Sequence, residues 1–125
     1  MATVNRVEKK VIMTKWDIIK YQILTHCYLK KILLSDADLE CLTLLSITGP
    51  IELTYFCYDA SEEYNIFKSS QTVRNCINKC EKFELVIKDP DNKKLIRVND
   101  NLRVQTEGLI MLDFKMLSKD EPQKT

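Results

Sequence analysis

The sequence predicts an α+β fold of three to four helices followed by a C-terminal β-hairpin, with an extra strand at each end. Helix-capping residues precede several segments in which apolar side chains recur at helical spacing. Two β-type runs then surround a turn rich in Asp, Pro and Asn. The chain has 125 residues, 45% hydrophobic and 30% charged, which is typical of one folded domain.

The N-terminal part predicts a short strand at residues 7–13 and then a long helix. Thr14 and Asp17 have the spacing of a capping box, and the helix should run to about residue 31. It has one apolar stripe formed by Trp16, Ile19, Ile23 and Cys27 and a second formed by Tyr21, Leu24 and Tyr28. A surface helix normally needs only one stripe. We therefore expect this helix either to be central to the core or to be partly covered by a partner.

Two further helices are expected in the middle of the chain. A second cap over Ser35–Asp38 begins a helix that should end near residue 46. Pro50 is well placed to open a third helix over residues 51–58, because proline is favoured in a first helical turn. Residues 61–67 should form a loop or a ragged turn.

A fourth helix is expected over about residues 71–83, capped by Ser69 and Ser70. Its apolar positions, which should face inward, are Val73, Cys76, Ile77 and Cys80.

A hairpin and a final strand complete the predicted fold. The β-type runs 85–88 and 94–98 are joined by turn residues at 89–93. Alternating apolar residues favour a strand at 109–117, although a helix there also fits the pattern. Residues 118–125 form a polar tail.

The segment Ser69–Lys88 (SSQTVRNCINKCEKFELVIK) resembles the recognition helix and first wing strand of the winged helix-turn-helix superfamily. The resemblance covers residues 35–104 and implies one winged-helix domain over residues 1–117, preceded by the strand and long helix of residues 7–31. The whole chain also resembles small winged-helix-like proteins of crAss-like phages of Bacteroidetes. Winged helices bind DNA, RNA or protein, so the fold alone names no function.

One departure from the superfamily lies after the recognition helix. A glycine usually precedes the wing there, whereas the segment Lys82-Phe83-Glu84-Leu85 has none. The acidic Glu84 also stands where the chain should pass near phosphate, which argues against DNA binding.

The charge of the chain is strongly segregated along the sequence. Nineteen basic and 18 acidic residues give a net charge of only +1. Residues 1–34 nevertheless carry +5, residues 35–67 carry seven acidic groups and no basic one, residues 68–97 carry +4, and residues 98–125 carry −1. The near-neutral sum is therefore a cancellation of opposed segments.

The first of two competing interpretations is a transcriptional regulator that binds double-stranded DNA. The recognition helix 70–82 would read base edges in the major groove and the wing 85–98 would contact phosphates. The absence of a basic excess weighs against it, since phosphate neutralisation supplies most non-specific affinity. The candidate nucleic-acid-binding residues are Ser70, Gln71, Arg74, Asn75, Asn78, Lys79, Lys82, Lys93 and Lys94.

The second interpretation, which we favour, is a virion structural protein that assembles as an oligomer near the head–tail connector. Acidic and basic faces of neighbouring copies would meet head to tail, with homo-oligomeric and other phage structural partners. The protein would be made in the host cytoplasm and end in the virion. The candidate protein-interface residues are Trp16, Tyr21, Leu24, Tyr28, Leu112, Phe114 and Met116.

Catalysis is the least favoured class, and we expect no catalytic residue, cofactor, metal or small-molecule substrate. Two glycines cannot build a phosphate-cradling loop, and five cysteines without a C-x-x-C pair fit reduced, buried thiols. Asp36, Asp38 and Glu40 are interpreted as acidic groups that stabilise a helix start. No apolar run approaches the ~20 residues that cross a bilayer, so no membrane association is expected.

Overall fold

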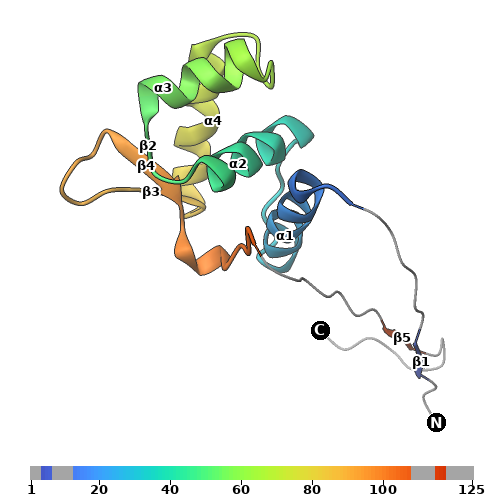
Figure 1. Cartoon of the computed structure of the whole chain (residues 1–125). Helices are drawn as coiled ribbons and strands as arrows, with labels where there is room; N and C mark the ends of the chain where they lie inside the picture. Colours follow the sequence, from blue (N-terminus) through green and yellow to red (C-terminus); the bar gives the residue numbers. More distant parts are fainter. Residues whose placement is uncertain (1–3, 7–12, 108–114, 118–125) are drawn as a thin grey trace. The chain divides into compact units, whose positions relative to one another are not determined.

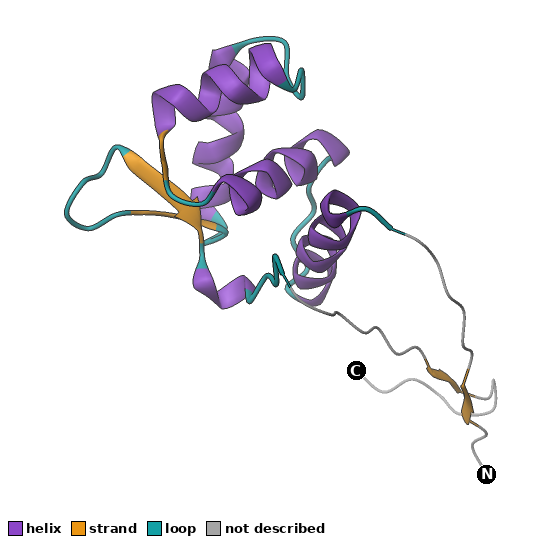
Figure 2. Cartoon of the chain, viewed as in Figure 1, coloured by secondary structure: helices purple, strands orange, loops and turns teal. Residues whose placement is uncertain are grey.

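A computed structural model describes residues 4–6, 13–107 and 115–117 (Figure 1). The chain divides into two compact units, one formed by residues 13–107 and the other by the two chain ends. The described residues form an α+β fold with helices and small antiparallel sheets, as predicted (Figure 2). The single domain expected over residues 1–117 stays a prediction.

The first two helices begin at the predicted caps. Helix α1 (Lys15–Leu29) follows Thr14, whose hydroxyl accepts a hydrogen bond from the backbone N–H of Asp17 at 3.1 Å. Helix α2 (Asp36–Thr48) follows a complete capping box, in which the side chains of Ser35 and Asp38 each bind the other's backbone N–H at 3.1 Å. Helix α1 packs mainly against α2.

The segment after Pro50 differs from the prediction of a helix over residues 51–58. Ile51–Glu52 forms strand β2, and helix α3 (Leu53–Tyr58) begins only after it. The helical chain then continues through a π-helical turn, η1 (Asp59–Glu63), where the beginning of the 61–67 loop was expected. The prediction was wrong at residues 51 and 52 because β2 forms its hydrogen bonds with a strand more than 40 residues further along the chain. Local periodicity cannot indicate such a distant partner.

Helix α4 and the hairpin match the predicted positions closely. Helix α4 (Ser70–Lys82) is capped by Ser69, whose hydroxyl accepts from the backbone N–H of Thr72. Strands β3 (Val86–Lys88) and β4 (Leu95–Val98) pair antiparallel, and a short 3-10 turn, η2 (Asp100–Leu102), follows. The sheet order is β2-β4-β3, so β4 is the central strand.

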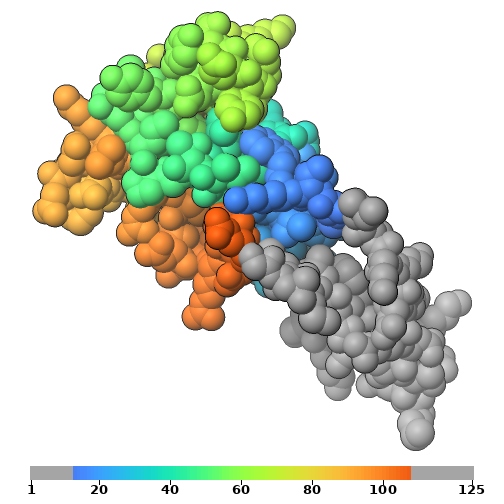
Figure 3. All heavy atoms as spheres, viewed as in Figure 1, coloured from blue at the N-terminus to red at the C-terminus, as the bar shows by residue number. Residues whose placement is uncertain are grey.

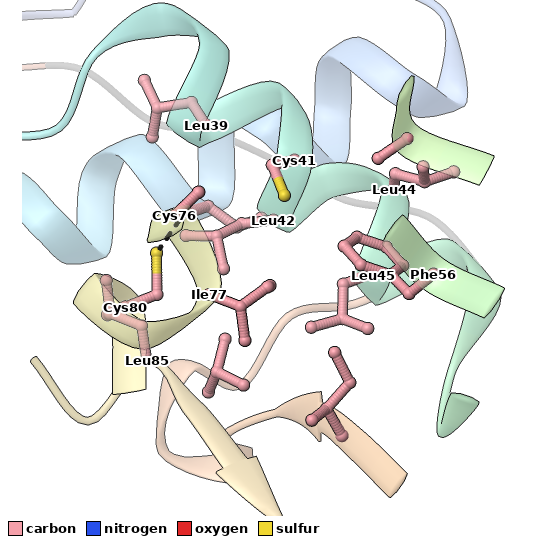
Figure 4. Close-up of a cluster of buried hydrophobic side chains, with 14 of the residues drawn as sticks. Leu39, Cys41, Leu42, Leu44, Leu45, Phe56, Cys76, Ile77, Cys80 and Leu85 are labelled. Atoms are coloured by element: carbon pink, nitrogen blue, oxygen red, sulfur yellow. Dashed lines mark hydrogen bonds between the residues drawn. The ribbon is translucent and has the colours of Figure 1, made fainter. Parts of the chain in front are cut away.

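The core of residues 13–107 is a cluster of apolar side chains contributed by all four α-helices and by the hairpin (Figure 4). The predicted inward positions of α4 are confirmed, because its two cysteines, Val73 and Ile77 are at most 3% exposed. In α1 the first stripe is buried at Ile19, Ile23 and Cys27. These contacts hold α4 against α2 while leaving its opposite face in solvent.

Helices α1 and α4 and the π-helical turn η1 each end on a left-handed residue that is not glycine. Lys31, Asn65 and Glu84 have φ values of 59°, 51° and 62°. In each case the N–H of the following residue donates to a carbonyl in the last turn, five positions back for Leu85 to Cys80 at 2.9 Å and six positions back for Ile66 to Ala60 at 2.8 Å. Glu84 thus adopts the conformation that a glycine usually supplies at this place.

The two chain ends form a separate two-stranded ladder. Strand β1 (Val4–Arg6) pairs antiparallel with β5 (Lys115–Leu117), and Asn5 lies opposite Met116. Lys115–Leu117 agrees with the end of the strand predicted at 109–117. The strand predicted at 7–13 is wrong at Met13, which is not in a strand, and residues 7–12, 109–114 and 118–125 lie outside the described residues.

Candidate binding surfaces

The exposed face of α4 carries polar side chains along its whole length. Gln71, Asn75, Asn78 and Lys82 are exposed and follow the four-three-four spacing of one helix face. The side-chain amide of Gln71 donates to the Asn75 side chain at 3.0 Å. Four of the nine predicted nucleic-acid-binding residues therefore lie together on one solvent-facing strip.

Two other predicted residues of α4 contact groups within the protein. Lys79 Nζ lies 2.5 Å from Asp38 Oδ2, and the Asp38 side chain is 4% exposed. Arg74 is half-buried and its guanidinium reaches the hydroxyl of Thr54 at 3.4 Å. The charge of Lys79 is matched by a buried carboxylate, so this lysine joins α4 to α2.

The environment of Asp38 explains its ionisation. Burial alone would raise the pKa of Asp38, but hydrogen bonds from Lys79, from Ser35 and from the Cys76 thiol together hold the pKa below its ordinary value. The hydrogen bond to Asp38 in turn raises the pKa of Lys79. Both groups are charged at neutral pH, and the pair is part of the fold.

The hairpin presents its basic residues in two ways. Lys88 and Arg97 form ion pairs with Glu81 at 3.7 Å and Asp100 at 2.6 Å. Lys93 and Lys94 are exposed in the turn between β3 and β4. Of the eight basic residues between positions 68 and 97, three therefore have a carboxylate partner within the protein: Lys79, Lys88 and Arg97.

The remaining predicted nucleic-acid-binding residue, Ser70, is the first residue of α4 and is exposed. Its hydroxyl lies 3.5 Å from that of the buried Ser61 in η1. Ser70 thus lies at the end of the polar strip.

The second apolar stripe of α1 is exposed in the unit of residues 13–107. Tyr21 and Leu24 are 46% and 43% exposed, and Tyr28 is 81% exposed. Leu29 and Leu33 extend the apolar surface past the end of the helix. Of the other predicted interface residues, Leu112 and Phe114 lie outside the described residues, and Met116 lies in β5.

Trp16, also predicted to be an interface residue, lies at the edge of a shallow cleft that sequence reasoning missed. Its indole N–H donates to Glu40, and its ring stacks on Tyr64 with centroids 6.0 Å apart and planes 16° apart. The cleft has a volume of about 390 Å³ and lies between the starts of α1 and α2 and the turn after η1. Its lining includes Trp16, Asp36, Glu40, Tyr64, Asn65 and Ile66.

We call this feature the Trp16–Tyr64 cleft. Its lining residues are up to 50 positions apart, and no local motif joins them, so only the packing of α1, α2 and η1 brings them together. Asp36 and Glu40, interpreted from the sequence as helix-start carboxylates, both bind Lys20 Nζ, at 2.7 and 3.2 Å.

The five cysteines are free and buried. Cys76 and Cys80 lie on one face of α4 with their sulfurs 4.0 Å apart. Cys41 and Cys80 each form a hydrogen bond with Cys76. This hydrogen bond, together with burial, raises the pKa of both Cys41 and Cys80. Among the described residues, no group of three or more His, Cys, Asp or Glu side chains has an arrangement that could hold a metal ion.

No helix in the described part of the chain has the length and apolar character needed to span a bilayer. Comparisons of the chain with protein-family models, with curated protein sequences and with solved structures found no match.

Proposed function

We propose that the protein is a non-enzymatic winged-helix protein that assembles with itself as a structural component of a phage particle, near the head–tail connector. The order of α2, β2, α3, α4 and the β3–β4 hairpin, with β2 beside β4, is compatible with a winged-helix layout. In this layout α4 is the recognition helix and the β3–β4 hairpin is the wing. The assignment to a phage particle rests on the sequence resemblance.

The observation that carries the assembly proposal is the exposed apolar stripe of α1. Tyr28 is 81% exposed on a helix whose other stripe is buried at Ile19, Ile23 and Cys27, and Tyr21 and Leu24 continue the exposed surface. Large apolar side chains grouped on one helix face are typical of surfaces that another protein covers. Oligomers with this property bury such a stripe between copies or against a neighbouring protein.

The ion pairs of the basic segment favour assembly over a DNA clamp. Lys79, Lys88 and Arg97 each have an internal carboxylate partner, so these cations are less available to neutralise phosphates. The acidic stretch of residues 35–67 adds repulsion toward a polyanion.

A second candidate function is supported by the polar strip of α4. Gln and Asn side chains can bind adenine edges bidentately, and Lys82 together with the wing lysines Lys93 and Lys94 could meet phosphates. This is the arrangement that a sequence-specific regulator of double-stranded DNA would use.

Light scattering combined with a duplex-binding titration distinguishes the two functions. Assembly predicts an oligomer whose mass grows with protein concentration and which is indifferent to duplex DNA. A monomer or dimer whose duplex affinity falls steeply with added salt would contradict it and support the regulator. Mass spectrometry of purified phage particles tests the location, and absence of the protein from the particle would exclude a virion role.

A further inference from the structure

The Trp16–Tyr64 cleft has the chemistry of a site for a positively charged side chain. Two aromatic rings line it, and the face of Trp or Tyr attracts a lysine or arginine cation. Tyr64 is 56% exposed, so part of its surface is available to a partner. Asp36, which also lines the cleft, has a side chain 78% exposed.

The charge at the cleft is negative. Asp36 and Glu40 share Lys20, which leaves one negative charge in excess among these three residues. The hydrogen bond to Asp36 is the main reason that the pKa of Lys20 is raised, so this lysine stays protonated. Glu62 and Glu63, both exposed, directly precede Tyr64 and add to the negative potential.

A complementary group lies at the wing of the same fold. Lys93 and Lys94 are adjacent and exposed in the β3–β4 turn. Within residues 13–107, neither of them forms an ion pair. The turn itself is well defined, because Asp89 accepts from the backbone N–H groups of Asp91 and Asn92.

The wing and the cleft lie at opposite sides of the unit formed by residues 13–107. Figure 1 shows the β3–β4 turn at one side and the starts of α1 and α2 at the other. The space-filling view shows the same separation between the orange hairpin atoms and the blue atoms of α1 (Figure 3). A wing therefore cannot reach the cleft of its own molecule.

We propose that the Lys93–Lys94 turn of one copy docks into the Trp16–Tyr64 cleft of the next copy. One lysine would lie against the aromatic faces and the other beside Asp36, replacing part of their water with charge-assisted contacts. This inference rests on the self-assembly proposed above and names a specific contact through which one copy binds the next.

A contact between different surfaces of two identical copies is heterologous. Each copy then has one free wing and one free cleft, so addition continues until the rotation closes a ring or the chain extends as a filament. The exposed apolar stripe of α1 lies outside this contact and remains available to a neighbouring protein of another kind.

The decisive experiment uses two full-length variants, each defective in one half of the contact. The wing variant is Lys93→Glu/Lys94→Glu, and the cleft variant is Asp36→Ala/Tyr64→Ala. Sedimentation velocity should show both variants as monomers where the unaltered protein assembles, with the dissociation constant raised about tenfold or more. An equimolar mixture should give a 1:1 dimer that grows no further, because only one functional wing and one functional cleft remain to meet.

Two controls separate the contact from general charge and from folding. Lys30→Glu/Lys31→Glu makes the same change of charge at the end of α1, far from the cleft, and should assemble as the unaltered protein does. Circular dichroism melts should show that each variant is folded, and Tyr58→Ala, which removes a tyrosine of similar exposure, should leave assembly unchanged.

The outcomes distinguish this proposal from the one before it. An unaltered protein that assembles, with a wing variant that assembles equally well or a mixture that forms no dimer, overturns the wing–cleft contact and leaves self-assembly standing. An unaltered protein that stays monomeric at all concentrations overturns both.

Discussion

Asp38 is the buried carboxylate that joins the start of α2 to the end of α4. It completes the capping box with Ser35 and binds Lys79 at 2.5 Å. Asp38→Ala removes both interactions, while Lys79, whose side chain is 46% exposed, can recover water. We expect a loss of roughly 2–3 kcal/mol in the free energy of unfolding, measured by urea denaturation. Asp36→Ala, at an exposed neighbouring carboxylate, should cost far less.

The pH dependence of stability follows from the same residue. The pKa of Asp38 is lowered in the folded state, so its contribution is fully present above the unfolded pKa of about 3.9 and is lost as the pH falls through the lower folded value. The unaltered protein should therefore lose stability below about pH 4 more steeply than Asp38→Asn. Equal slopes of unfolding free energy against pH in the two proteins would contradict this assignment.

Glu84 has a backbone conformation that favours glycine. At φ 62° a side chain costs up to about 1 kcal/mol, whereas glycine adopts this region freely. Glu84→Gly removes this cost but also increases the entropy of the unfolded chain, which offsets part of the gain. The net effect should be a rise of about 0.5 kcal/mol in the free energy of unfolding. The hydrogen bond from Asn99 to the Glu84 carbonyl is retained. Glu84→Ala is the control, and a gain in that variant would show that the conformation is not the cause.

The side chain of Gln22 connects helix α1 to the backbone of Gln105, near the end of the unit formed by residues 13–107. The amide of Gln22 donates to the Gln105 carbonyl at 2.8 Å and accepts from the Gln105 backbone N–H at 2.7 Å. Gln22→Ala removes both bonds and should cost about 1–2 kcal/mol in thermal or urea unfolding. Gln105→Ala keeps both, since they involve its backbone, and should be nearly neutral. A comparable loss in the two variants would contradict this account.

The sequence predicted best those elements that are coded locally. Ser69 caps α4 and the inward phase of Val73 and Ile77 is correct, because capping and helical periodicity are both read within one or two turns. Strand β2 was missed, because two residues have no detectable period and Ile51 is extended only by pairing with Ile96. The π-helical turn η1 was missed for a related reason: tertiary contacts, with Ala60 and Ser61 buried, override the polar composition of the segment.

The candidate surfaces divide in the same way. The polar strip of α4 follows directly from which positions the apolar phase leaves outside. The Trp16–Tyr64 cleft could not be foreseen, since its residues come from three elements and no pattern relates them. Lys79 is one of the predicted nucleic-acid-binding residues, and only the structure places a buried carboxylate within its reach.

At the scale of the whole molecule, docking of one copy on the next should change the fluorescence of Trp16. Trp16 is the only tryptophan of the chain and lies in the cleft proposed to receive the wing, so its fluorescence reports on that site. Its emission should move to shorter wavelength as protein concentration rises, because docking excludes water from the ring. The shift should weaken with added salt.

The wing variant Lys93→Glu/Lys94→Glu supplies the matching control for this measurement. Its Trp16 environment is unaltered in the monomer, and its emission should stay constant over the same concentrations. Assembly without any change in Trp16 emission would place the interface elsewhere.

The paired chain ends also determine how the molecule responds to force. In the β1–β5 ladder Val4 lies opposite Leu117, so the two ends of the chain leave the ladder at the same edge. A pull applied to both ends therefore opens the hydrogen bonds one after another, as a zipper does, rather than shearing them together. In an assembly that strains its subunits through their termini, this ladder would therefore open before the core of residues 13–107 unfolds.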